Sequence, residues 1–236
     1  MGCNHANTAV TYHCKENGEI LIYRKEELFK VCIHEMFHAL GLDWHEMPVT
    51  NFKQKLRRIF KIKSTMLTPE AYSEVWGCIL NCCFTGYFLC NKELEEFLLF
   101  TEYCLEIERI FSLFQLYKIL KFMGINYVTL YKNDDTSKSL RKYMYKENTN
   151  IFMYYILKTL FLYNNLDFMI FCNNNNKNFI NFSLTETNMN NLYNFIHKRY
   201  DDINFITDIN KVCKNIKLKS DDILKRTMRL TALELV

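Results

Sequence analysis

Proline and glycine are scarce in this chain of 236 residues, which has two prolines and six glycines. So few turn-forming residues exclude a β-sandwich of many short strands and favour long helices. No basic segment followed by an apolar segment opens the chain, so we expect no secretion. The longest run without charge, residues 75–91, is 17 residues. It is short for a membrane span and typical of a buried helix, so we expect no span.

Ten cysteines are spread along the chain without the paired spacing of a metal-binding knuckle. We expect them to be reduced, buried thiols, as in a reducing compartment. The net charge of +4 is small for a protein that binds nucleic acid. Such a role would need a local cluster of cations, and we expect no nucleic-acid partner.

The first elements are placed by turn and cap residues. Residues 8–24 predict a β-hairpin with its turn around Asn17-Gly18. A helix is expected over residues 25–40, with Gly41 as its stop. A second helix is expected to begin at Thr68-Pro69, because Thr can cap a helix and Pro suits its first turn.

The rest of the chain predicts mostly helix. Apolar residues recur at helical spacing or follow polar breaks in further segments, which are residues 92–123, 138–163, 187–199 and 220–235. The last of these begins at Ser220-Asp221-Asp222, which predicts a capped start. The asparagine-rich residues 173–178 predict a loop. We therefore expect an α+β fold dominated by helices, with a small N-terminal hairpin or sheet.

Residues 34–38 read His-Glu-Met-Phe-His, the pattern H-E-x-x-H. On a helix, His34 and His38 share one face, so both imidazoles can reach one zinc ion. Glu35 lies beside them without needing to bind the metal. A carboxylate next to a zinc-bound water is the arrangement that generates hydroxide near neutral pH.

A third ligand can come from residues 68–77, TPEAYSEVWG. Glu70 and Glu74 share one helix face. One can bind zinc through a carboxylate oxygen, and the other can accept the second ring N–H of a zinc-bound histidine. Two histidines and one glutamate would leave a fourth position open for water, as in catalytic zinc sites.

These two segments, in this order, resemble the zinc-binding helices of thermolysin-like gluzincin peptidases. The family pattern in the second segment is Glu-Ala-x-Ser-Asp, matched here with Glu74 in place of Asp. The resemblance implies that His34, His38 and Glu70 are zinc ligands, Glu35 the general base, and Glu74 a partner that orients His34. Residues 23–76 also resemble predicted metallopeptidases encoded by large nucleocytoplasmic DNA viruses.

Several departures from that family leave alternatives open. Pro69 stands where the family commonly has Asn, and the longer Glu74 is an alternative ligand to Glu70. Metzincins carry a third histidine six residues after the second, where this chain has Trp44. His45 is next to it, one residue out of register, and is a further alternative.

The residues that would stabilise the transition state are not distinguished by the sequence. The family uses a Tyr and a His for this purpose. The candidates here are Tyr12, His13, Tyr72 and His197. Only 33 residues precede His34, so the hairpin is expected to be a remnant of the substrate-binding sheet, or the chain a truncated form.

The sequence therefore predicts a zinc metallopeptidase that hydrolyses a peptide or protein substrate, with Zn²⁺ as cofactor. The alternative is a catalytically inactive, zincin-like viral structural or host-interaction protein. We expect a zincin-like metal-binding region over residues 1–125 and a helical region over 126–236, packed as one unit. The expected location is intracellular, in the host cytoplasm or the virion if the source is viral. The oligomeric state is not predicted.

Overall fold

The computed structural model describes residues 8–12, 14–44, 50–215 and 222–235. The predicted hairpin is confirmed: β1 (Ala9–Thr11) pairs with β2 (Ile20–Ile22) in an antiparallel two-stranded sheet. Val10 lies opposite Leu21, and both are exposed. Asn17 in the connecting turn has a φ of 56°, which asparagine tolerates better than most residues.

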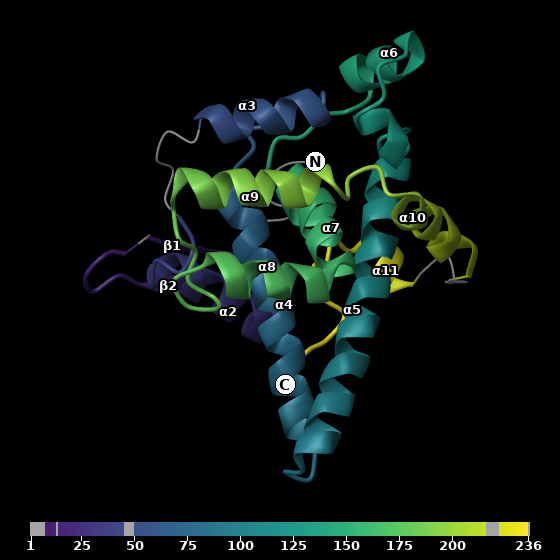
Figure 1. Ribbon diagram of the computed structural model, residues 1–236. Coiled ribbons are helices and arrows are strands. Elements are labelled where there is room, and N and C mark those ends of the chain that lie inside the picture. The colour runs from purple at the N-terminus through teal and green to yellow at the C-terminus, as the bar shows by residue number, and fades with distance from the viewer. Residues whose placement is uncertain (1–7, 13, 45–49, 216–221, 236) are drawn as a thin grey trace.

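Two long helices, together with the shorter α2, form the frame of the molecule (Figure 1), and the α+β fold dominated by helices is confirmed. These are α2 (Leu28–Ala39), α4 (Thr68–Leu89) and α5 (Leu94–Phe122). Gly41 follows α2 with a φ of 62°, the left-handed conformation expected of a helix stop. Thr68 does not cap α4, because Leu67 holds that position and Thr68 is already helical.

An antiparallel pair formed by α4 and α5 projects from the body of the molecule (Figure 1). Gly86 allows the close approach, since a Cβ there would lie 2.4 Å from Oγ1 of Thr101. No helix in the described part of the chain is both long and apolar enough to span a membrane.

Further helices, all shorter than α4 and α5, lie in the rest of the described chain. They are α3 (Thr50–Ile59), η1 (Tyr127–Leu130), α6 (Asp135–Tyr143), the π-helical η2 (Phe152–Leu157), α7 (Lys158–Tyr163), α8 (Asn165–Asn175), α9 (Glu186–His197), α10 (Ile203–Asn215) and α11 (Ile223–Arg226). One hydrophobic core contains residues from Ile33 to Leu230, so both regions expected from the sequence contribute to it.

Several helix predictions were wrong in extent. The predicted helix over 138–163 is broken between α6 and η2, where the Glu147 carboxylate accepts hydrogen bonds from Tyr145 and the Phe152 N–H. The helix α8 continues into the predicted loop at 173–178, and α10 was not predicted.

The predicted C-terminal helix over 220–235 was also wrong. Among its described residues, 222–235, only α11 is helical, and Asp222 caps it. Ser220 and Asp221 of the expected cap lie outside the described residues. Residues 227–235, here called the C-terminal strap, are not helical. Their backbone N–H groups are taken by side chains instead: Glu27 accepts from Leu230 and Thr231 at 2.6 and 2.7 Å. Contacts with distant residues therefore override the local helical pattern.

Candidate metal centre

The residues of the H-E-x-x-H motif lie on α2, and the glutamates of the second motif lie in the first two turns of α4. The two helices pack against each other along these turns. Helical spacing puts His34 and His38 on one face of α2, and Glu70 and Glu74 on one face of α4. Packing of the two faces brings the four side chains together.

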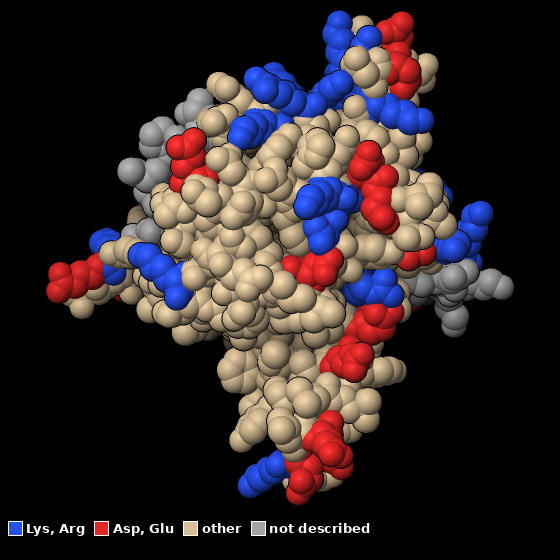
Figure 2. Space-filling model, in the orientation of Figure 1, with Lys and Arg blue, Asp and Glu red and all other residues tan. Residues whose placement is uncertain are grey.

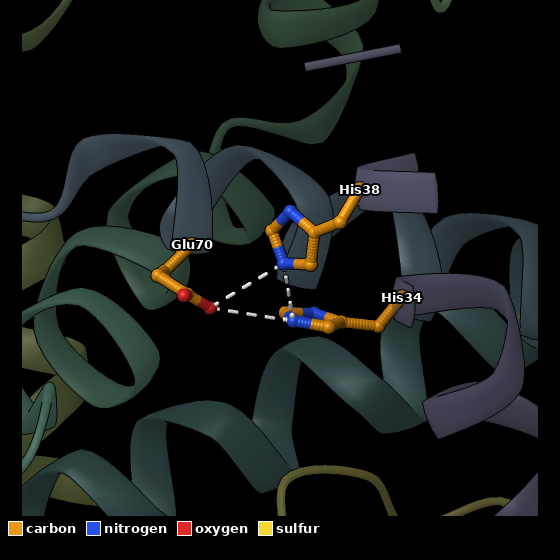
Figure 3. A group of neighbouring side chains, drawn as sticks. All are labelled: His34, His38 and Glu70. Carbon is orange, nitrogen blue, oxygen red and sulfur yellow. Dashed lines mark hydrogen bonds and ion pairs between the residues drawn. The ribbon is translucent and has the colours of Figure 1, made fainter. Parts of the chain in front are cut away.

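Two imidazole nitrogens and one carboxylate oxygen point toward one another (Figure 3). The Nε2 atoms of His34 and His38 are 3.1 Å apart. Oε2 of Glu70 lies 3.4 Å from the first and 3.6 Å from the second. The three atoms form a nearly equilateral triangle of potential ligands.

The other ring nitrogen of each histidine faces a second carboxylate. Nδ1 of His38 lies 2.6 Å from Oδ2 of Asp43. Nδ1 of His34 lies 2.9 Å from Oε2 of Glu74, a short contact whose angle is poor for a hydrogen bond. A proton on each Nδ1 leaves the Nε2 lone pairs pointing toward Glu70. This is how carboxylates orient metal-binding histidines in known sites.

The glutamates of α4 have different positions in the cluster. Glu74 is buried, and its Oε1 accepts a hydrogen bond of 2.6 Å from the Lys30 ammonium. It therefore lies behind His34, while Glu70 lies in front of both rings. The alternative ligand His45 lies outside the described residues.

Strong local fields act on these groups. Burial alone would raise the pKa of Glu74, but Lys30 and His34 lower it to about 2. The pKa of Glu70 is also lowered: burial opposes this, and the two histidines outweigh it. Burial would lower the pKa of His38, yet Asp43 and Glu70 raise it to about 10. The carboxylates around the two imidazoles therefore favour a positive charge between them.

A cavity of about 180 Å³ opens onto the three ligand atoms. Its walls come from residues 8–11 around β1, from α2 and α4, and from three residues of the C-terminal half: Asn150, Tyr154 and Leu230. Glu35 also lines it, is 8% exposed, and has a pKa raised by burial. Within the described residues, no hydrogen bond or ion pair holds its carboxylate.

The sequence did not predict two residues that contact the candidate ligands, Tyr154 and Asp43. The Tyr154 hydroxyl donates a hydrogen bond of 2.9 Å to Oε2 of Glu70 across 84 residues of chain, and no sequence signal marks it. It lies in η2, and π-helical turns are common at functional sites. A weak sequence signal pointed to Asp43, because a turn at Gly41 brings the following residues back toward His38.

The three candidates for transition-state stabilisation that the structure describes, Tyr12, Tyr72 and His197, do not line the cavity. Tyr12 is exposed, and the buried Tyr72 donates a hydrogen bond to the backbone oxygen of Ile180. His197 is exposed at the end of α9. His13 lies outside the described residues.

Comparison with known proteins adds no relative. No protein-family model, no curated protein and no solved structure matches this chain. The functional argument therefore depends on the chemistry of the cavity and on the two sequence motifs.

Proposed function

We propose that this chain is a zinc-dependent peptidase whose metal ligands are His34, His38 and Glu70. The observation that carries the proposal is the triangle of ligand atoms. Zinc binds such donors at 2.0–2.1 Å in a tetrahedron, whose edges are therefore about 3.3 Å. The three measured separations, 3.1, 3.4 and 3.6 Å, surround this value.

The donor set also favours zinc. Two imidazoles and one carboxylate are ligands of catalytic zinc sites, and such sites keep the fourth position open. Here the open side is the cavity that Glu35 lines. Asp43 and Glu74 fix the two rings from behind, which supports metal binding more than an accidental pair of histidines would.

The residues of the cavity suit peptide hydrolysis. A bound zinc ion would supply a Lewis acid that polarises the scissile carbonyl and makes water more acidic. Glu35 would take a proton from the attacking water and give it to the leaving nitrogen, a transfer favoured by its raised pKa. A peptide would lie along β1, because among the described strands β1 pairs only with β2. Its other edge has backbone groups for a further strand.

The test uses purified protein, elemental analysis and a peptide library. We expect one zinc ion per chain and turnover that a chelator abolishes and added zinc restores. Glu35→Gln should retain zinc and lose about 10²- to 10⁴-fold in turnover, since the base is removed and the ligands remain. The control Glu26→Gln makes the same change at an exposed glutamate outside the cavity, and it should retain both zinc and turnover. Turnover that survives both the chelator and Glu35→Gln would refute the mechanism.

A second candidate is a zincin-like scaffold without catalysis, which acts through interactions. The observation that favours it is the sheet, whose two strands have three residues each and offer a substrate only a short edge. Stoichiometric zinc without turnover of any library peptide would support this alternative over the peptidase.

A further inference from the structure

Basic residues are concentrated at one end of the molecule. Residues 50–63 and 127–147 carry eleven Lys or Arg and three Asp or Glu, a net charge of +8. The whole chain has a net charge of +4, so the remainder is −4. The modest overall charge therefore conceals a strong separation of charge between two parts of the chain.

The two basic segments are distant in sequence and adjacent in space. The Lys61 N–H donates a 3.0 Å hydrogen bond to the Leu130 carbonyl oxygen, which joins the segments. Arg141 holds α6 against η1 by donating to the carbonyl oxygens of Thr129 and Lys132 at 2.5 and 2.6 Å. Figure 2 shows the resulting gathering of Lys and Arg over α3 and α6. The cations are thus held on a fixed surface.

We call this surface the basic ridge. It is defined by six exposed residues: Arg57, Arg58, Lys61, Lys63, Lys142 and Lys146. Within the described part of the chain, none of the six forms an ion pair with a carboxylate. Among the described residues no carboxylate relieves their mutual repulsion, which favours the binding of solvent anions or of an anionic partner.

The acids of these segments are engaged elsewhere. Asp134 caps α6 by accepting from Ser137, and Asp135 pairs with Lys138 at 2.9 Å. The Glu147 carboxylate accepts hydrogen bonds from Tyr145 and the Phe152 N–H. None of the three is placed to neutralise the ridge, so its surface potential is strongly positive.

The side chains exposed on the ridge favour binding to a phosphate backbone over binding to a lipid surface. A helix that binds an anionic bilayer inserts an apolar face. The apolar residues of α3, Phe52, Leu56 and Ile59, are buried in the core and not available. Tyr143 is 63% exposed next to Lys142, and an exposed aromatic ring beside cations can stack on a base.

We infer that the basic ridge binds the phosphate backbone of nucleic acid without sequence preference. Neutralising about four to six phosphates gives a log–log salt slope of about −4 to −5 on duplex DNA. The inference does not depend on the metal centre, because the ridge and the ligand triangle share no residue.

The test measures fluorescence anisotropy of two labelled DNA duplexes of unrelated sequence, with the full chain, between about 50 and 200 mM salt. We expect equal affinities and the steep slope given above. Arg58→Glu/Lys61→Glu should weaken binding at least about tenfold and reduce the slope by about 2. The matched control Lys25→Glu/Lys177→Glu makes the same charge change at exposed positions outside the ridge and should bind almost as the wild type does.

Three results would overturn the inference. The first is no binding at the lowest salt by protein whose melting curve is that of a folded chain. The second is an equal loss in the ridge and control variants, which would indicate a general charge effect. The third is tighter binding to phosphatidylserine vesicles than to DNA, lost in the ridge variant, which would identify a membrane as the partner.

Discussion

Two neighbouring clusters of charged residues differ in what their charges contact. The metal-centre cluster contains His34, His38 and Glu70 together with the residues behind them. The strap cluster contains Glu27, Glu108 and Lys158, which bind the C-terminal strap. The strap cluster is fully buried, whereas His38 and Glu70 of the metal-centre cluster are partly exposed to the cavity.

In the strap cluster the charges are met by backbone groups. Oε1 of Glu108 accepts from the Thr231 hydroxyl and from the N–H groups of Ala232 and Leu233, the latter two at 2.7 and 3.0 Å. The Lys158 ammonium donates to the Leu230 carbonyl oxygen at 2.8 Å. These side chains supply hydrogen bonds that a helix would otherwise have made.

In the metal-centre cluster the charged groups contact one another, and three lone-pair atoms converge beside a cavity. This difference separates a structural use of buried charge from a functional one. A buried acid that accepts several N–H groups fixes the chain. An acid aimed at two imidazole nitrogens is placed to hold a cation. Substitutions in the metal-centre cluster should therefore change mainly zinc affinity, and those in the strap cluster mainly the free energy of unfolding.

The largest expected effect is on metal binding. Glu70→Ala removes a ligand oxygen, and zinc affinity should fall by more than about 100-fold, because even partners behind ligands contribute 10- to 100-fold. Competition with a chelating dye measures the affinity. Glu108→Ala, in the strap cluster, should retain zinc in its folded state. Equal affinities in Glu70→Ala and the wild type would rule out Glu70 as the third ligand.

The next effect is on stability. Glu108→Ala leaves the N–H groups of Ala232 and Leu233 without their acceptor, and the free energy of unfolding should fall by about 3 kcal/mol. Urea unfolding followed by circular dichroism measures it. The exposed Glu102→Ala, on the same helix, should change it by no more than about 0.5 kcal/mol. A similar small change in both variants would mean that the strap contributes little to the fold.

The sequence predicted features that depend on local contacts and missed those that depend on residues far away in the chain. The H-E-x-x-H residues, the helix stop at Gly41 and the turn at Asn17 depend on neighbours a few residues away. Such local contacts can be predicted from the order of residue types in the sequence. The two helices that carry the proposed zinc ligands were placed for this reason.

The strap could not be predicted, because its partners are remote. Glu27 binds Leu230 and Thr231 across 203 and 204 residues. No local pattern encodes such a pairing, so the segment was expected to continue as a helix. The same reason applies to Tyr154, which reaches the metal centre from a helix that the sequence had marked only as apolar.

A smaller effect is expected at Asp43, the residue behind His38. Asp43→Asn retains an oxygen for the Nδ1 proton but removes the charge, and zinc affinity should fall about 10-fold. The same dye competition measures it, with the exposed Asp135→Asn as control. A loss as large as that of Glu70→Ala would instead make Asp43 a ligand, and unchanged affinity would mean that its contact with His38 is only structural.

The smallest effect concerns pH and the strap cluster. Burial raises the pKa of Glu108 above its ordinary 4.5, although Lys158 and the strap oppose the shift. The folded chain therefore holds this proton more tightly than the unfolded chain. The resulting stabilisation is complete below the unfolded pKa and is lost as pH rises through the folded pKa.

Glu108→Gln should remove this pH dependence, since its amide oxygen can still accept from the strap and the side chain does not titrate. Oε2 of Glu108 has no hydrogen-bond partner among the described residues, so the amide nitrogen that replaces it lacks an acceptor there, a cost that does not change with pH. The unfolding free energy of the variant, relative to the wild type, should increase as pH rises from 4 toward neutrality, about three units. Urea midpoints across that range measure the trend, with Glu102→Gln as the control. A flat difference would show that Glu108 titrates alike in both states, and that the strap cluster tolerates its charge as readily as water does.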